Sequence, residues 1–232
     1  MKLVLIGCEY TGTTTLALGL NEWAEKTIGS GFRIIHDHWK LPHTSGHLPT
    51  DTAHFLDADE QAQVLALSPK LKEMTQRHSL YYHTPSAPDD ENRLILGYLF
   101  DDGIYGPLYF EYGRPTDPED RSVVGRAVEN TLLKNAPETV LVMLKATPEV
   151  IRARMKKTPH AGGVLREPDV EFVLERFDSE FKYSLISKKF ALDTSESTPA
   201  ETLAQFVANV EKYLTEVDRS RIMLHSVGLK AG

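Results

Sequence analysis

A glycine-rich segment after the first apolar run constrains the fold of this chain more than any other feature. Residues 7–15 read Gly-Cys-Glu-Tyr-Thr-Gly-Thr-Thr-Thr, between an apolar run at 3–6 and a helix-like stretch at 14–26. A strand, a glycine-rich turn and a helix form the context in which the pattern G-x-x-x-x-G-K-[ST] binds phosphate. Gly7 and Gly12 have the spacing of this pattern, and Thr14 stands at the position of its magnesium-binding hydroxyl. The sequence therefore predicts a phosphate-binding loop (P-loop), and a glycine turn without a ligand is the alternative.

The loop departs from the pattern at one position, because Thr13 stands where its lysine is expected. Backbone N–H groups at a turn and a helix N-terminus bind an anion without any side-chain charge. The lysine would reach the β- and γ-phosphates, so we expect phosphate binding to survive its loss better than phosphate transfer. The residues expected to bind the nucleotide are those of the loop: Gly7, Glu9, Tyr10, Thr11, Gly12, Thr13, Thr14 and Thr15.

Strand-like and helix-like segments alternate along the chain, which predicts an α/β protein. The segments expected to form strands are 2–7, 32–37, 93–100, 139–145 and 189–192. Their apolar residues are mostly continuous, which suits strands buried on both faces of a parallel sheet. Helices are expected at 14–26, 57–82 with a break at Pro69, 118–134, 147–157, 167–186 and 198–217. Residues 218–232 show no clear partner signal and are expected to form a C-terminal tail.

Composition and charge exclude several classes of protein. The chain has 232 residues, of which 41% are hydrophobic and 25% charged, as in an ordinary soluble globular domain. It shows neither a long apolar run nor a signal-peptide pattern, so we expect a cytoplasmic protein without a membrane partner. The net charge of −7 argues against a long nucleic acid as the partner, because neutralisation of phosphates by Lys and Arg dominates that affinity.

Acidic residues follow two of the predicted strands, at the edge where a parallel sheet binds its ligands. Asp101 and Asp102 end the third strand, and an acid at this place is typical of a carboxylate that organises Mg²⁺. We therefore expect Thr14 and Asp101 to bind the metal, with Asp102 as the alternative to Asp101. Asp37 ends the second strand and would accept the proton of an acceptor hydroxyl; a hydrogen-bonded loop acid is the alternative.

A basic segment stands out in this acidic chain. It contains Lys145, Arg152, Arg154, Lys156, Lys157 and Arg166. A hinge-like His-Ala-Gly-Gly at 160–163 lies between Lys157 and Arg166. A movable arm that carries arginines closes over a triphosphate and stabilises the charge that develops during phosphoryl transfer. We therefore expect catalytic roles for Arg152, Arg154 and Arg166, and a solvated helix face is the alternative.

In their order along the chain, these segments resemble the P-loop kinase superfamily, most of all its nucleoside and nucleotide kinases, such as the deoxynucleoside and thymidylate kinases. The resemblance covers roughly residues 2–217 and rests on 7–15, Asp37, 100–105, 144–154, 191–195 and 198–202. It implies a three-layer P-loop NTPase fold, a parallel sheet of about five strands flanked by helices. It also implies one domain at 1–217 with a helical lid at about 152–168, ATP and Mg²⁺ as cofactors, and a homodimer.

Two departures from the family pattern bear on activity. The resemblance matches Asp37 to the catalytic acid and Asp101 to the first member of an Asp/Glu-Arg pair, but Asp102 stands where that arginine belongs. Thr13 and Asp102 both remove a positive charge, and one missing donor typically lowers the rate on the order of 10²–10³-fold.

The leading hypothesis is an ATP-dependent phosphotransferase that acts on a nucleoside, a nucleotide or a similar small hydroxyl-bearing metabolite. One alternative is a nucleotide-binding regulatory protein, or pseudokinase, without transfer activity. The other is a P-loop kinase directed at nucleic acid.

Overall fold

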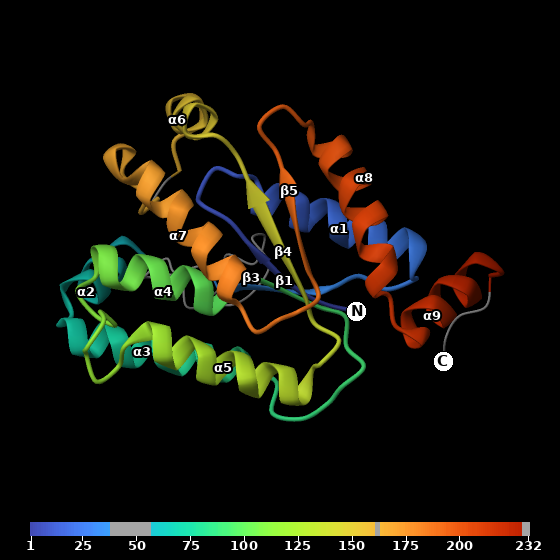
Figure 1. Cartoon of the computed structure of the whole chain (residues 1–232), viewed down its shortest axis with the longest axis horizontal. Helices are drawn as coiled ribbons and strands as arrows, with labels where there is room; N and C mark the ends of the chain where they lie inside the picture. The colour runs from blue at the N-terminus through green and yellow to red at the C-terminus, as the bar shows by residue number, and fades with distance from the viewer. Residues whose placement is uncertain (38–56, 161–162, 229–232) are drawn as a thin grey trace.

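The protein is built on a five-stranded parallel sheet with helices on both faces (Figure 1). The structure is a computed structural model that describes residues 1–37, 57–160 and 163–228. The strand order is β2-β3-β1-β4-β5, so the first strand lies at the centre. The strands are β1 (Lys2–Ile6), β2 (Arg33–Asp37), β3 (Arg93–Gly97), β4 (Val140–Lys145) and β5 (Lys189–Asp193). The predicted three-layer α/β fold and the five parallel strands are thereby confirmed.

The helices divide between the two faces of the sheet, and each group covers its own hydrophobic core (Figure 1). Leu20 of α1 and Phe206 of α8 share one core with Leu5 of β1 and Leu96 of β3. Helices α1 (Thr13–Thr27), α8 (Pro199–Val210) and α9 (Glu216–Ser226) lie together on this side. The other core is covered mainly by α3 (Pro69–His83), α4 (Tyr98–Tyr109), α5 (Arg121–Asn135) and α7 (Val170–Tyr183).

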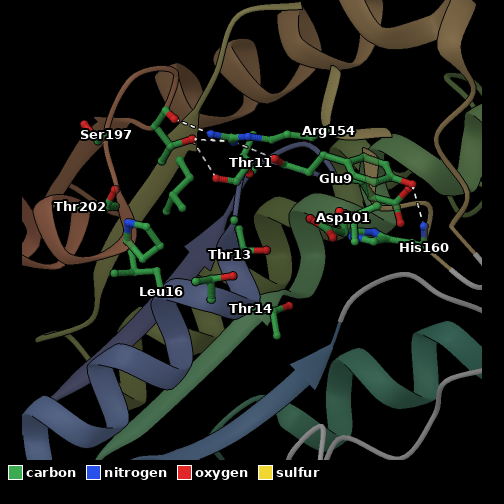
Figure 2. Close-up of a pocket in the computed structure, with 18 of the residues that line it drawn as sticks. Glu9, Thr11, Thr13, Thr14, Leu16, Asp101, Arg154, His160, Ser197 and Thr202 are labelled. Atoms are coloured by element: carbon green, nitrogen blue, oxygen red, sulfur yellow. Dashed lines mark hydrogen bonds between the residues drawn. The ribbon is translucent and has the colours of Figure 1, made fainter. Parts of the chain in front are cut away.

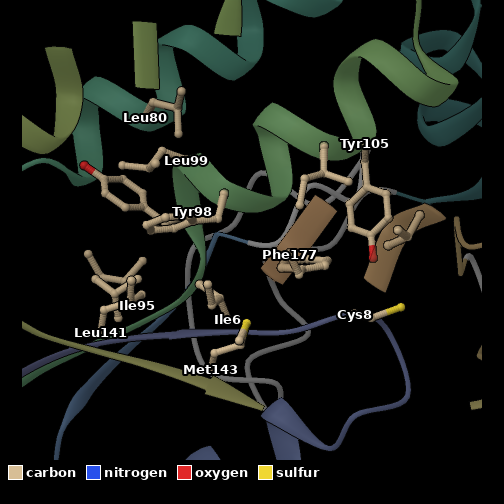
Figure 3. Packing of buried hydrophobic residues seen from close by; sticks show 14 of the residues in the cluster. Ile6, Cys8, Leu80, Ile95, Tyr98, Leu99, Tyr105, Leu141, Met143 and Phe177 are labelled. Atoms are coloured by element: carbon tan, nitrogen blue, oxygen red, sulfur yellow. The ribbon is translucent and has the colours of Figure 1, made fainter. Parts of the chain in front are cut away.

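The second core shows why the strands read as continuous apolar runs. Ile6, Ile95 and Met143 turn their side chains toward Tyr98 and Phe177 of the covering helices (Figure 3). Leu5 and Leu96, next to them along the strands, enter the core on the opposite face. Both sets of side chains are buried, so the central strands need apolar residues at every position.

The predicted strand at 93–100 is wrong in its second half. β3 ends at Gly97, and Tyr98 begins α4, so Asp101 lies in the first turn of a helix and not at the end of a strand. Gly97 and Tyr98 have φ values of 76° and 55°, which turn the chain sharply from strand to helix. A buried apolar run does not distinguish strand from helix by its pattern, which explains the error.

Two further segments differ from the expectation. The helix expected at 167–186 begins as one turn of 3₁₀-helix (Glu167–Asp169) and continues as α7. The last predicted helix ends at Val210, and a new helix, α9, occupies most of the segment expected to be a tail. Thr215 and Asp218 form the capping box that starts α9. The apolar stripe of residues 203–217 runs across this break, so the sequence predicts one helix where the structure has two.

The remaining helices follow the prediction closely. The break expected at Pro69 separates α2 (Ala58–Ala66) from α3, with Ser68 as the cap of α3. Helix α6 (Pro148–Lys157) begins after its expected cap, Thr147, whose side chain accepts a hydrogen bond from the Val150 N–H. None of the helices in the described part of the chain is both long and apolar enough to cross a membrane.

A buried ionic cluster joins α3, α4 and α5 under the second core. Arg121 is 3% exposed, and its guanidinium contacts Glu73 at 2.9 Å and Asp102 at 2.6 Å. The Tyr112 hydroxyl donates to the other oxygen of Asp102 at 2.6 Å. Asp102 is therefore committed to Arg121 and Tyr112, and Asp101 is the acid of this pair that reaches the candidate site.

We expect Arg121→Met to destabilise the protein strongly, because it leaves Glu73 and Asp102 buried without their shared cation. Breaking a buried ion pair costs about 3–5 kcal/mol of unfolding free energy, measurable by urea denaturation. Arg33→Met is the matched control, since its pair with Glu91 spans 3.5 Å between half-exposed side chains. The control should stay within about 0.5 kcal/mol of the wild type, and equal effects of both substitutions would contradict the prediction.

Candidate nucleotide-binding site

The P-loop lies between β1 and α1, at the carboxyl edge of the sheet. Gly7 has no room for a side chain, because a Cβ atom there would lie 2.6 Å from Thr11 Oγ1 and 2.7 Å from the Leu144 carbonyl oxygen. Gly12 has a φ of 96°, a left-handed conformation that favours glycine, and it leads directly into α1. The two glycines singled out by the sequence are thus required by the backbone of the loop itself.

A cavity of about 420 Å³ opens in front of this loop (Figure 2). The predicted loop residues Gly7, Glu9, Tyr10, Thr11, Gly12, Thr13, Thr14 and Thr15 all line it. Its volume falls within the range of small-molecule sites. The N-terminus of α1 faces this space, and a helix N-terminus with its unpaired N–H groups attracts anions. The residues expected to bind phosphate therefore surround one cavity, and anion binding there stays a prediction.

Thr13 and Thr14 differ in their surroundings. Thr13 is only 9% exposed in the first turn of α1, whereas Thr14 is half-buried. Both line the cavity, and neither carries a charge. A hydroxyl at position 14 suits Mg²⁺, and the position of the missing lysine is occupied by a largely enclosed small side chain.

Asp101 reaches the same cavity from the first turn of α4, although that turn is a helix and not the predicted strand. It is 4% exposed. Burial, together with Cys8, Asp101 and Glu9, raises the pKa of the neighbouring Tyr105 well above its usual value. The carboxylates of Glu9 and Asp101 thus line the same cavity beside the P-loop.

The donor atoms here fit Mg²⁺. Hydroxyl and carboxylate oxygens are the ligands that this ion prefers, and it is usually held by one or two carboxylates together with substrate phosphates. Within the described ranges, no group of three or more His, Cys, Asp or Glu side chains forms a protein-only metal cluster. Thr14 and Asp101 would accordingly hold the ion jointly with a nucleotide.

The three predicted catalytic arginines have different environments. Arg152 pairs with Glu171 at 2.6 Å on the surface of the lid region. Arg166 lies 4.8 Å from the ring centroid of Tyr109, in a cation–π contact. Of the three, only Arg154 lines the cavity, and the structure does not bring the other two into its lining.

Arg154 holds the cavity together through backbone contacts (Figure 2). Its Nη1 donates to the Tyr10 carbonyl at 2.9 Å and to Thr194 Oγ1 at 3.1 Å, and its Nη2 donates to the Thr194 carbonyl at 2.5 Å. The Thr194 hydroxyl in turn donates to the Thr11 carbonyl at 2.9 Å. Partial burial lowers the pKa of Arg154, which still carries its charge at neutral pH. The lid helix, the P-loop and the segment after β5 thus meet at one guanidinium.

Asp37 lies at the end of β2, opposite Gly97 of β3 in the ladder. Its backbone is therefore at the same edge of the sheet as the P-loop. Its role as the catalytic acid stays a prediction.

Sequence reasoning did not identify part of the cavity wall. The residues it missed are Leu16, Tyr105, Leu144, Thr158, His160, Thr194, Ser197, Pro199 and Thr202. Thr194 and Thr202 belong to segments on which the family resemblance rests, so their position after β5 and in α8 was the available signal. Tyr105 lies one turn of α4 beyond Asp101, a relation that is visible only once the helix is recognised.

The basic segment is largely neutralised by acids of the same region. Arg152 and Lys156 contact Glu171 and Glu167, and Lys145 contacts Asp178 at 2.6 Å. Three of the six basic residues of this segment are therefore paired with acids.

We expect Cys8 to be inert in the folded protein. It is 1% exposed, and burial, followed by the nearby Glu9 carboxylate, raises its thiol pKa. The reactive thiolate is consequently scarce at pH 8 and becomes abundant only at higher pH. A disulfide reagent that releases a coloured thiol measures the rate of modification. The native thiol should react at least about 100-fold more slowly than the urea-unfolded thiol. Equal rates in the two states would contradict this burial.

No protein-family model matches the chain, and no curated protein matches it in sequence. Solved structures do match it. Deoxyadenosine kinase from M. mycoides with bound dCTP aligns over 91% of this chain and 100% of its own, with a TM-score of 0.50 and 14% identity. The same enzyme with bound dATP aligns over 90% of this chain and 99% of its own, with a TM-score of 0.53 and 13% identity. Thymidylate kinase from Candida albicans aligns over 95% of this chain and 93% of its own, with a TM-score of 0.53 and 14% identity. The chain therefore has the P-loop nucleoside/nucleotide kinase-like fold that its sequence predicts.

Proposed function

We propose that the protein is a phosphotransferase that uses ATP with Mg²⁺ and acts on a nucleoside, a nucleotide or a similar small hydroxyl-bearing metabolite. The observation that carries the proposal is the meeting of the P-loop, Asp101 and Arg154 in one cavity at the carboxyl edge of the sheet. The matched enzymes, a deoxyadenosine kinase and a thymidylate kinase, support the same class of chemistry.

The residues of the cavity suggest a division of labour. The N–H groups of the P-loop and of the α1 N-terminus would bind the phosphates, with Thr14 and Asp101 holding the metal. Bound Mg²⁺ would neutralise charge on the phosphate oxygens. Asp37 would take the proton of the acceptor hydroxyl. The hydroxyl oxygen of the acceptor would then bond to the γ-phosphorus of ATP, and the bond from that phosphorus to the β–γ bridging oxygen would break, releasing ADP.

Arg154 is the candidate for the cation that Thr13 does not supply. Three of its five N–H donors are used by Tyr10 and Thr194. The donors left are on Nε and Nη2, the edge of a guanidinium that binds two oxygens of one phosphate. The other two predicted arginines are engaged elsewhere, since Arg152 pairs with Glu171 and Arg166 lies against the Tyr109 ring.

A nucleotide-binding regulatory protein without transfer activity is the second candidate. It is favoured by Thr13 and by the two carboxylates, Glu9 and Asp101, that line the cavity against a single arginine. A nucleic-acid-directed kinase receives less support, because the chain carries a net charge of −7 and two of the lid cations, Arg152 and Lys156, are paired with acids. A cytoplasmic location, a homodimer and the bounds of the domain at 1–217 stay predictions.

We expect calorimetry to detect binding of ATP and ADP with dissociation constants on the order of micromolar in Mg²⁺, and much weaker binding in EDTA. Asp101→Asn should reduce the difference between the two conditions, because it removes one metal ligand. ADP release with a panel of nucleosides and nucleoside monophosphates then separates transfer from binding alone. Absence of binding at millimolar nucleotide would remove both the kinase and the regulatory proposal.

We expect Thr13→Lys to raise nucleotide affinity or turnover if the site is a P-loop that has lost its lysine. The added ammonium would lie near the β- and γ-phosphates. Leu18→Lys is the matched control for the added charge, because Leu18 is 43% exposed on α1 and does not line the cavity. A lower melting temperature of Thr13→Lys without any gain in binding would mean that the enclosed site at position 13 does not admit a lysine.

A further inference from the structure

The side chain of Glu9 leaves the P-loop and reaches the backbone of the lid, here α6 with the described residues 158–160 and 163–166. Its Oε2 accepts hydrogen bonds from the N–H groups of Val164 at 3.1 Å and Leu165 at 2.9 Å. Its Oε1 is buried as well. Hydrogen bonds to an ionised carboxylate are among the strong ones in proteins, particularly where water is excluded. One loop side chain therefore fixes two consecutive lid residues.

The next loop residue, Tyr10, adds contacts to the same element. Its ring stacks on His160 with 4.0 Å between ring centroids and an interplanar angle of 15°. Its hydroxyl accepts a hydrogen bond from the His160 N–H at 3.1 Å, and its carbonyl accepts one from Arg154. Tyr10 has a φ of 70°, which non-glycine residues seldom adopt. The lid contacts and this loop conformation therefore occur together.

Other attachments of the lid differ in strength. Ile151 of α6 is fully buried in the second core, and Arg154 of α6 is bonded to Thr194, so the start of the lid is held independently of Glu9. The pairs Arg152–Glu171 and Lys156–Glu167 join exposed side chains and contribute little. The N–H of Arg166 donates to the Tyr109 hydroxyl at 3.2 Å, where the lid passes into α7. Leu165 is 7% exposed and packs into the second core, so its burial is the main rival of Glu9 as the anchor.

We propose that Glu9 is a positioning residue that sets the place of the lid over the P-loop, through the N–H groups of Val164 and Leu165. Tyr10 adds to this contact from the loop side, through His160 and Arg154 of the lid. This role is separate from the proposed transfer reaction, because it requires only the loop and the lid. Its test therefore uses the protein without nucleotide and does not depend on activity.

The test is amide hydrogen exchange and limited trypsin cleavage of the full chain with Glu9→Ala and Glu9→Gln. Loss of the acceptor frees the amides of Val164 and Leu165 directly, so the decisive readouts lie elsewhere on the lid. In Glu9→Ala we expect the His160 amide to exchange about tenfold faster or more, because its bond to Tyr10 opens with the lid. Cleavage after Lys157 should accelerate in parallel. Glu9→Gln, which retains a neutral acceptor, should give smaller increases in both.

Glu167→Ala is the matched control. Glu167 lies two residues from Leu165, and its carboxylate pairs with Lys156 between exposed side chains. We expect its exchange and cleavage rates to stay within about twofold of the wild type. Unchanged His160 exchange and trypsin cleavage in Glu9→Ala would overturn the proposal in favour of Leu165 packing. So would an equal acceleration in Glu167→Ala. If Glu9→Ala unfolds the whole protein, Glu9→Gln with the same readouts decides.

Discussion

The close approach of two backbone segments at Gly7 is the constraint on which the rest of this structure depends. The chain leaves the central strand so near the carbonyl of Leu144 that a Cβ atom would lie 2.7 Å from that oxygen. Because β1 is hydrogen-bonded to β4 at this point, the loop that follows must turn at the carboxyl edge of the sheet. The position of the α1 N-terminus, the cavity and the contacts with the lid all follow from that turn. A side chain at position 7 would disturb each of them.

Much of this arrangement can be predicted from the sequence, and the parts that cannot have two causes. Apolar runs buried on both faces located the five strands, and Pro and Thr caps located most helix starts. The boundary at Gly97 was missed because buried helix and buried strand have the same apolar composition. Asp101 nevertheless reaches the expected cavity, since one turn of helix carries it to the same edge of the sheet. The contacts of Arg154 with Tyr10 and Thr194 join residues 144 and 40 positions apart, and no local pattern encodes them.

The charge balance of the cavity differs from that of a site built only to attract phosphate. Glu9 and Asp101 line it, Thr13 contributes no charge, and Arg154 shares its guanidinium with two carbonyl oxygens. Attraction of an anion here depends on backbone N–H groups and the helix dipole more than on side chains. A divalent cation that arrives with the nucleotide would offset the carboxylates. Under the proposed function, the same residues would repel a nucleotide that lacks a metal and would favour the metal complex.

The backbone conformation of Tyr10 couples the P-loop to the lid. A left-handed conformation at a residue with a bulky side chain costs on the order of 1–3 kcal/mol, and it persists only where neighbouring contacts hold it. Here those contacts come from His160 and Arg154, which belong to another element. Once that element swings away, the backbone at Tyr10 is free to relax to a more favourable φ. The conformation of the loop is therefore coupled to the position of the lid.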